Sequence, residues 1–466
     1  MKKKLHNGLW ISSTNLSNNL MGSSRYSNFL SSKISARYNL DLLYFMPIKK
    51  VPENKKNLIQ FNNIFFIEKK PRKIPIIKSD EGCNIYFDNI QIDLIKWIEK
   101  NFSIRKYKFV ICDYIYLAPI FDFLPRNVLK IINTHDIYGD RYKKLKWGNT
   151  EKEKFFSCSS YQEINLLRKS DLVIAISELE AKYFKRLLKS IDKRIFVSTV
   201  RYNNNKMLNI NRKLDSVPTK KNLILGFIGS SNSINQYGIR KLFLSLDKIQ
   251  NKNFEFHLAG SICNEIKEEY SWLKKLYIIQ EEKLIDYLNS INLMVNPMPK
   301  NTTGLKIKTV ESFQNNVPII GTKDAFSGIN TKSIWHEANS IEELISLLKK
   351  ILNSNDLFKK VEKDTNLLKK SYKEETKNDI DYLLKEIENK ILIFKLFLSD
   401  KFHVKLLCFL INLKRNFEEL ISINKNKKFL NQLDIQELRE SVKFRSIMVN
   451  YYLNKIKNME RKTNEK

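Results

Sequence analysis

Short apolar runs alternate with helix-length amphipathic segments in the N-terminal part of the chain. One segment, SSRYSNFLSSKISARY (23–38), predicts a helix, and the strands are expected at LWIS (9–12), DLLYFMP (41–47), KFVICDY (108–114), VLKIINTHD (128–136) and SDLVIAIS (170–177). Ser177 with Glu180 three residues later forms a capping-box pattern, which predicts that the helix ELEAKYFKRLLKS begins there. This alternation is typical of parallel sheets with helices on both faces, so we predict a doubly wound domain over 1–205.

The same alternation restarts in the second half of the chain. A polar, proline-containing segment, 206–222, predicts an interdomain linker. The strands expected after it are LILGFIGS (223–230), FEFHLAG (254–260), YIIQ (277–280), INLMVNP (291–297) and VPIIGT (317–322). We therefore predict a second doubly wound domain over 223–375. From 376 to 466 no strands are expected, and we predict a crossing helix followed by a basic helical extension.

The predicted fold class is α/β, with two Rossmann-like domains that face each other across a cleft. In doubly wound sheets, ligands bind outside the carboxyl ends of the strands, where the strand order reverses. The residues that directly follow strands are therefore the candidates for chemistry.

Composition narrows the possible partners. The chain has 466 residues, is 42% hydrophobic and 11% aromatic, and carries a formal net charge of +32. Such a charge suggests nucleic acid, but lysine is far commoner than arginine and the basic residues are spread along the chain. Specific readers of nucleic acid rely on arginine forks. We therefore expect no nucleic-acid partner, while attraction to phosphates or anionic lipid surfaces stays open.

The spacing of the cysteines and the length of the apolar runs indicate a cellular compartment. The five cysteines are widely separated and show no metal-binding spacing, which fits a reducing, cytoplasmic setting. The basic N-terminus lacks an apolar stretch long enough for a signal peptide, and no run reaches the roughly 18 apolar residues of a spanning helix. We expect a cytoplasmic protein, with peripheral contact at the inner face of the membrane left open.

The turn GFIGSSNS places Gly229 and Ser230 between a strand and a helix. Glycine allows close backbone approach, and hydroxyl and amide groups at a helix N-terminus can bind phosphate oxygens. The turn matches neither the GxGxxG fingerprint nor a Walker loop. An ordinary tight strand–helix turn is the structural alternative.

The stretch NTTGLKIKTVESF follows a predicted strand and starts a predicted helix near Gly304. Lys308 and Glu311 are three residues apart and share a helical face, whereas Lys306 lies elsewhere on the surface and is expected to be a turn or rim residue. An ammonium group beside free helix amides suits a diphosphate, and a carboxylate one turn further can accept hydrogen bonds from ribose hydroxyls. The alternative is an exposed Lys–Glu pair.

These segments resemble a known family. GFIGS, FEFHLAG and YLNSINLMVNPMPKNTTGLKIKTVESFQNNVPIIGTKDAFSGI are similar to the nucleotide-sugar-binding half of group 1 glycosyltransferases with the GT-B architecture, many of them retaining. MGSSRYSNFL, INTHDIYGDR and EINLLRKSDLVIAISELEAKYF resemble the first half of these enzymes more loosely. The resemblance covers about residues 8 to 375.

The resemblance implies roles for single residues. Glu311 would hold the ribose of a nucleotide-sugar and Lys308 its diphosphate, with Gly229 and Ser230 lining the phosphate pocket. The family's Glu-x7-Glu pair would place its first member at Thr303, where this chain has no carboxylate. Some members have a small turn there instead, so Thr303 and Gly304 are expected to hold the donor sugar.

His135 and Asp136 follow the strand VLKIINT at the carboxyl edge of the first predicted sheet. The imidazole could bind the donor sugar or an acceptor hydroxyl, and Asp136 could orient it or act as a base. These are the candidate catalytic residues, with a capped strand end as the alternative. Gly22, Arg25 and Arg141 are candidates for the acceptor or phosphate side.

The resemblance implies transfer of a hexosyl group from a nucleotide-sugar to a glycan, lipid-linked or protein acceptor, in bacterial glycan or glycoprotein assembly. No metal constellation occurs, and we expect neither a metal nor a cofactor, because a helix N-terminus and a lysine can offset the charge of a leaving diphosphate. Retention is expected from the resemblance, and inversion with Asp136 or His135 as base stays open. A catalytically silent GT-B protein that serves as partner or scaffold of an active transferase is the alternative.

The segment ILIFKLFLSDKFHVKLLCFLINL (391–413) is apolar but interrupted by lysines. It fits either a helical hairpin packed against protein or a helix on an anionic membrane surface. Residues 391–466 are therefore the candidate contact for a protein partner or a membrane.

Overall fold

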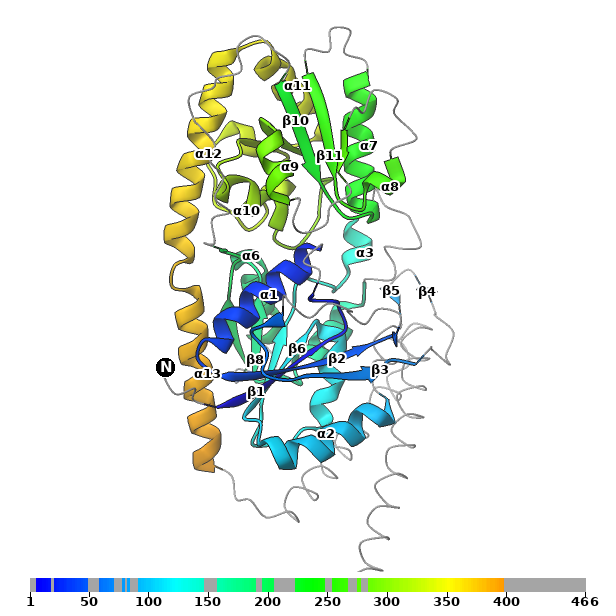
Figure 1. Ribbon diagram of the computed structural model, residues 1–466, viewed down its shortest axis with the longest axis vertical. Helices are drawn as coiled ribbons and strands as arrows, with labels where there is room; N and C mark the ends of the chain where they lie inside the picture. Colours follow the sequence, from blue (N-terminus) through cyan, green and yellow to red (C-terminus); the bar gives the residue numbers. More distant parts are fainter. Residues whose placement is uncertain are drawn as a thin grey trace, which may run out of the picture.

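The computed structural model contains two parallel sheets, each flanked by helices, stacked along the long axis of the molecule (Figure 1). It describes residues 6–17, 21–48, 58–70, 78–79, 82–83, 91–145, 157–189, 195–204, 223–247, 254–266, 275–277 and 284–397. The predicted linker and most of the predicted C-terminal extension lie outside these residues. We call residues 6–204 the first unit and residues 223–354 the second unit.

The first unit contains a seven-stranded sheet of order β3-β2-β1-β6-β7-β8-β9, in which all neighbouring strands are parallel. Its strands are β1 (Asn7–Ser12), β2 (Asn39–Met46), β3 (Ile64–Glu68), β6 (Phe109–Asp113), β7 (Leu129–Asn133), β8 (Leu172–Ala175) and β9 (Phe196–Thr199). The strand order reverses between β1 and β6, which places a ligand-binding position at their carboxyl ends. The strands β4 (Lys78–Ser79) and β5 (Gly82–Cys83) pair with each other as a separate antiparallel hairpin and do not join this sheet.

Alternation along β1 explains how helices cover both faces of this sheet. Trp10 belongs to an apolar cluster with side chains of α1 (Gly22–Ser35) and α13 (Asp379–Phe397). Leu9 and Ile11 point to the other face. That face packs on the helices α2 (Ile92–Arg105), η3 (Ile115–Phe123), α5 (Ser160–Leu167) and α6 (Glu178–Lys189).

The second unit contains a five-stranded parallel sheet of order β12-β11-β10-β13-β14. Its strands are β10 (Leu223–Ile228), β11 (Phe254–Ala259), β12 (Lys275–Tyr277), β13 (Leu293–Asn296) and β14 (Ile319–Gly321). Its helices are α7 (Ser233–Asp247), α8 (Cys263–Ile266), α9 (Leu284–Ser290), α10 (Ile307–Gln314), η5 (Lys323–Phe326), η6 (Ile334–His336) and α11 (Ile341–Leu352). The strand order reverses between β10 and β13, so the turns after these two strands form the second ligand-binding position.

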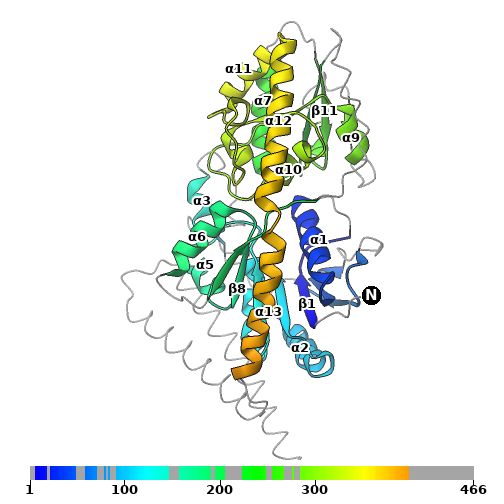
Figure 2. The ribbon, with the colours of Figure 1, turned by 90° about the vertical axis from the view of Figure 1, so that its left-hand side faces the viewer.

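The chain then returns to the first unit. Helix α12 (Asn355–Thr376) packs along the second unit, and α13 continues along the first sheet, as Figure 2 shows in yellow and orange. Tyr38 Oη donates to the Leu384 carbonyl at 3.4 Å, and Arg37 pairs with Glu388 at 2.6 Å. The first sheet is therefore completed by a helix from the far end of the described chain.

The helix predicted to begin near Gly304 begins later, at Ile307, with Lys306 as its N-cap residue. Gly304 has a φ of +80°, which glycine adopts readily and which is incompatible with a right-handed helix. Residues 301–306 therefore form a turn before the helix, and Lys306 belongs to that turn.

Candidate active site between the two units

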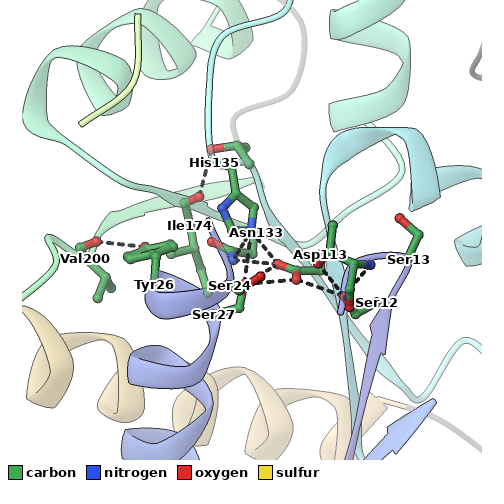
Figure 3. A network of polar contacts seen from close by, with 12 residues as sticks. Ser12, Ser13, Ser24, Tyr26, Ser27, Asp113, Asn133, His135, Ile174 and Val200 are labelled. Atoms are coloured by element: carbon green, nitrogen blue, oxygen red, sulfur yellow. Dashed lines mark hydrogen bonds and ion pairs between the residues drawn. The ribbon is translucent and has the colours of Figure 1, made fainter. Parts of the chain in front are cut away.

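A buried polar network occupies the reversal point of the first sheet, where β1 and β6 end (Figure 3). Asp113 ends β6 and is fully buried. Its carboxylate accepts hydrogen bonds from Ser12 Oγ at 3.1 Å and from Ser27 Oγ at 2.9 Å. Asn133 Nδ2 donates to it at 2.9 Å, and His135 Nε2 lies 2.5 Å away. Such contacts satisfy a buried carboxylate, so the network fixes the imidazole of His135 in place.

The partner of His135 is therefore Asp113, and the prediction that Asp136 orients the imidazole is wrong. His135 has a φ of +63° and stacks on the Tyr114 ring at 4.1 Å between centroids. Its Nδ1 atom is buried and has no hydrogen-bond partner. One edge of the ring is thus held by Asp113, and the other has a free hydrogen-bonding position.

Asp136 points toward the second unit. Its carboxylate accepts hydrogen bonds from the Ile137 amide at 2.9 Å and from Arg141 Nη1 at 2.6 Å. A Cβ atom placed on Gly304 would lie 3.4 Å from the Asp136 carboxyl carbon. The turn before α10 therefore lies directly against the loop after β7, which carries both predicted catalytic residues.

The turn after β10 is built by Gly229, Ser230 and Asn235. A Cβ atom on Gly229 would lie 2.8 Å from the Phe227 ring, so only glycine fits there without displacing a neighbour. Asn235 Nδ2 donates to the Ser230 carbonyl oxygen at 2.9 Å. The Asn235 side chain thereby ties the turn to the first residues of α7.

Asn235 also joins this turn to α10. Its Oδ1 atom accepts a hydrogen bond from Lys308 Nζ at 2.7 Å, and the ammonium group lies 4.1 Å from the centroid of the Phe227 ring. Burial lowers the pKa of Lys308 well below its usual range, and the positive charges of Lys306 and Arg25 lower it further. Among the described residues no carboxylate offsets this charge, so an anion placed here would be stabilised.

Glu311 lies one turn further along α10 and is 6% exposed. Its Oε1 atom lies 2.7 Å from Arg25 Nε and accepts a hydrogen bond from Tyr202 Oη at 3.3 Å. Its Oε2 atom is buried without a partner. Burial raises the pKa of Glu311, although Arg25 and Tyr202 oppose the rise.

Helix α1 of the first unit packs directly on α10. A Cβ atom on Gly22 would lie 3.3 Å from the Cβ of Ile307, so the helix start needs a small residue there. Arg25, one turn along α1, reaches Glu311 as described above. Two candidates for the acceptor or phosphate side, Gly22 and Arg25, therefore contact the helix that carries the donor candidates.

Glu180 and Lys306 also lie at this interface, although neither was predicted as a site residue. Lys306 Nζ donates to the carbonyl oxygens of Thr303 at 2.5 Å and Gly304 at 2.7 Å. Burial lowers the pKa of Lys306 to about 8, although the negative charge of Asp136 opposes this shift. Burial and the charge of Asp136 raise the pKa of Glu180 to about 8. Glu180 carried a recognisable signal only as a helix-cap residue.

Only one of the two hydrogen bonds of the predicted capping box between Ser177 and Glu180 is formed. Ser177 Oγ accepts a hydrogen bond from the Glu180 amide at 3.3 Å, as predicted for an N-cap. Both carboxylate oxygens of Glu180 lack a hydrogen-bond partner, so the return bond to the Ser177 amide is not made. The carboxyl group is directed to the interface with the second unit instead.

Contacts of Gly22, Arg25 and Asp136 with α10 and the turn before it join the predicted site residues of the two units, and Asn235 links the turn of Gly229 and Ser230 to Lys308. The first unit contributes Gly22, Arg25, His135, Asp136 and Arg141, and the second contributes Gly229, Ser230, Thr303, Gly304, Lys308 and Glu311. Within the described ranges no cluster of three or more His, Cys, Asp or Glu side chains could hold a metal ion. No helix in these ranges is long and apolar enough to cross a membrane.

Solved structures share this architecture over the described chain. Sucrose-phosphate synthase from Thermosynechococcus elongatus superposes with a TM-score of 0.59 at 14% identity, covering 83% of this chain and 100% of that chain. HepE of Anabaena, solved in complex with UDP and glucose, gives a TM-score of 0.56 at 9% identity, covering 83% of this chain and 99% of that chain. The chain has the GT-B fold. At sequence identities this low, the similarity to these structures shows a shared fold only.

A further GT-B structure and a sequence family agree with that result. WaaG, described as a glycosyltransferase involved in lipopolysaccharide biosynthesis, gives a TM-score of 0.53 at 11% identity, covering 82% of this chain and 99% of that chain. Residues 222–354 match the family described as "Glycosyl transferases group 1". The search of curated proteins gives no significant match. The family match lies in the second unit, which carries Lys308 and Glu311.

Proposed function

We propose that this GT-B protein is a glycosyltransferase that moves a hexosyl group from a nucleotide-sugar to a hydroxyl-bearing acceptor. One observation carries the proposal. Lys308 and Glu311 lie three residues apart on α10, at the point where the second sheet reverses its strand order. Lys308 is half-buried and no carboxylate of the described residues offsets its charge, while Glu311 is buried with its Oε2 atom unpartnered. The family match of residues 222–354 supports the same reading.

The roles follow from the chemistry of each group. The Lys308 ammonium, held by the Asn235 amide oxygen, would offset the charge of the diphosphate, assisted by the first free amides of α10. The free Oε2 atom of Glu311 would accept hydrogen bonds from ribose hydroxyls. Gly229 and Ser230 would line the phosphate position, and the Thr303–Gly304 turn would lie beside the sugar.

In the proposed reaction the bond between the sugar C1 and the diphosphate oxygen breaks, and a bond from C1 to the acceptor oxygen forms. The acceptor hydroxyl proton passes to an oxygen of the leaving diphosphate on the same face, which gives retention. His135, held at Nε2 by Asp113, would offer Nδ1 to a hydroxyl of sugar or acceptor. No metal or cofactor takes part in this proposal.

The proposed acceptors are glycans, lipid-linked glycans or proteins of a bacterial cell. With these acceptors, the proposed location is the cytoplasm, with contact to the inner face of the membrane. Residues 391–466 are the proposed contact for a membrane or a protein partner, and most of them lie outside the described part of the chain.

A catalytically silent partner protein is the second candidate. It is favoured by Thr303, which stands where the resemblance expects a carboxylate, and by Arg25, which occupies Oε1 of Glu311. Such a protein would bind a nucleotide without breaking a sugar–phosphate bond.

The test is thermal stabilisation by UDP, GDP, CMP and their sugar conjugates, followed by an assay for release of sugar from the donor that binds. A ligand at a hundred times its dissociation constant adds about 2.7 kcal/mol to the free energy of unfolding. We expect one nucleotide class to stabilise the protein, Glu311→Gln to remove that stabilisation, and the exposed control Glu337→Gln to keep it. No stabilisation by any compound would refute the proposal, and stabilisation without sugar release or transfer would favour the silent partner.

A further inference from the structure

The carboxyl group of Glu180 is buried at the interface between the units without a hydrogen bond. The residue is 2% exposed, and neither carboxylate oxygen has a partner. The peptide groups of Ile176 and Gly304 lie close enough to lower the pKa of the carboxyl group, but neither donates a hydrogen bond of good geometry. A buried polar group left unpaired is costly, so a ligand that supplies the missing partner is the physical explanation we pursue.

The turn that Glu180 faces has an unused polar group of its own. The hydroxyl oxygen of Thr303 is buried and has no hydrogen-bond partner. The carbonyl oxygens of Thr303 and Gly304, in contrast, accept hydrogen bonds from Lys306 Nζ. Lys306 therefore holds the turn in shape, while the Thr303 hydroxyl remains available to a bound molecule.

This turn directly precedes α10, whose first turn carries Lys308. In a nucleotide-sugar, the sugar is joined to the second phosphate. If the diphosphate lies on Lys308, the sugar is therefore placed next to the neighbouring turn. The Thr303 hydroxyl and the Glu180 carboxyl group approach that position from the two units.

We propose that Glu180 binds the donor sugar, its carboxyl group forming hydrogen bonds with hydroxyls of the hexosyl part of the nucleotide-sugar. The inference rests on the proposed function and adds a residue of the first unit to the donor site. The Thr303 hydroxyl, already expected to hold the donor sugar, would contact the same group.

The surrounding charges suit this role. Asp136 and Lys306 face Glu180 from the loop after β7 and from the N-cap of α10, and Tyr26 faces it from α1. Burial and Asp136 raise the pKa of Glu180 to about 8. This shift favours the carboxylic acid form, which can both donate and accept a hydrogen bond with a sugar hydroxyl.

A purely structural role predicts a different geometry. If Glu180 served only to cap α6, its carboxylate would accept the Ser177 amide hydrogen, as in a complete capping box. That bond is absent, although the bond from the Glu180 amide to Ser177 Oγ is present. The side chain is thus free of the helix that carries it.

The experiment compares affinities for a nucleotide and its sugar conjugate, measured by titration calorimetry: UDP with UDP-glucose, and GDP with GDP-mannose. Glu180→Ala should weaken binding of the sugar conjugate about tenfold or more, the loss of one or two buried hydrogen bonds, and leave the nucleotide alone unaffected. Glu180→Gln, which keeps a donor and an acceptor, should retain most of the affinity. Glu178→Gln, exposed in the same helical turn, is the matched control.

Each outcome decides a separate point. Equal binding of the sugar conjugate by Glu180→Ala and the unaltered protein would overturn the inference and leave the proposed function standing. An equal loss for nucleotide and conjugate, or a loss in Glu180→Gln as large as in Glu180→Ala, would show a structural role and also overturn it. If the unaltered protein binds none of these four compounds and no other member of the panel of UDP, GDP, CMP and their sugar conjugates, the proposed function fails and the inference with it.

Discussion

His336 is a buried imidazole in the second unit whose protonation opposes folding. It is fully buried in η6, its Nδ1 atom lies 2.6 Å from Thr331 Oγ1, and its ring stacks on Phe326 at 4.4 Å. Burial lowers its pKa to about 4, although Asp364 opposes the shift. Folding therefore favours the neutral ring.

This shift predicts an acid-sensitive stability. Because the folded pKa lies below the unfolded value of about 6.5, the contribution is complete above pH 6.5 and is lost as the pH falls toward 4. Over that window the loss is about 3 kcal/mol, at about 1.4 kcal/mol per pH unit. Urea unfolding at several pH values should show that His336→Gln loses less stability between pH 6.5 and 4 than the unaltered protein. Parallel pH profiles of the two proteins would contradict the assignment.

At the residue scale, the sequence predicted where the site residues lie better than it predicted their hydrogen-bond partners. Ser177 was predicted as an N-cap because a cap depends on neighbours in the chain. His135 was placed correctly after β7, but its carboxylate partner is Asp113, 22 residues earlier at the end of β6. Strand pairing sets that contact, and a local pattern carries no information about it.

The contact between α1 and α10 joins the two units through a buried ion pair. Arg25 Nε lies 2.7 Å from Glu311 Oε1, with 13% and 8% of the side chains exposed. Removal of one partner leaves the other as a buried charge without its counterion, which typically costs about 3–5 kcal/mol.

A double-mutant cycle tests this contact. Arg25→Met and Glu311→Gln should each lower the free energy of unfolding by about 3 kcal/mol, and the double variant should lose clearly less than the sum. Urea unfolding provides the four values. The exposed pair Lys377 and Glu374 is the control, where the coupling should be below about 1 kcal/mol. Additive losses at Arg25 and Glu311 would show that the two side chains do not stabilise each other.

At the element scale, strands were predictable and the start of α10 was not. Apolar runs marked β1, β2, β6, β7 and β8 because buried parallel strands are apolar on both faces. The short strands β3 and β9 were not predicted. At α10, the positive φ of Gly304 and the bonds from Lys306 to the turn delay the helix to Ile307, and these bonds depend on tertiary burial.

At the scale of the whole molecule, helices α12 and α13 connect the two large parallel sheets of the described residues. Arg201, just after β9, donates from Nε to Asp379 Oδ2 at 2.9 Å, and Asn203 Nδ2 donates to Thr376 Oγ1 at 2.6 Å. Both bonds lie where α12 gives way to α13. The segment after β9 and the α12–α13 junction are thus tied together where the chain crosses between the units.

The alternation of strands and helices predicted the two parallel sheets of the GT-B fold. It predicted a crossing helix after residue 375, and α13 does pass along the first sheet, from Asp379 to Phe397. The position of α13 against Tyr38 could not be read from the sequence, because that packing joins the far end of the described chain to its beginning. The interface between the two units has the same long-range origin.

The central claim is that Lys308 binds the diphosphate of a nucleotide. Titration calorimetry with UDP and UMP, or with GDP and GMP, tests it most directly on the unaltered protein, on Lys308→Met and on the exposed control Lys350→Met. The account predicts that the unaltered protein and the control prefer the diphosphate. Lys308→Met should lose about tenfold to a hundredfold in diphosphate affinity and much less in monophosphate affinity. Equal diphosphate affinity in Lys308→Met and the unaltered protein would contradict the account.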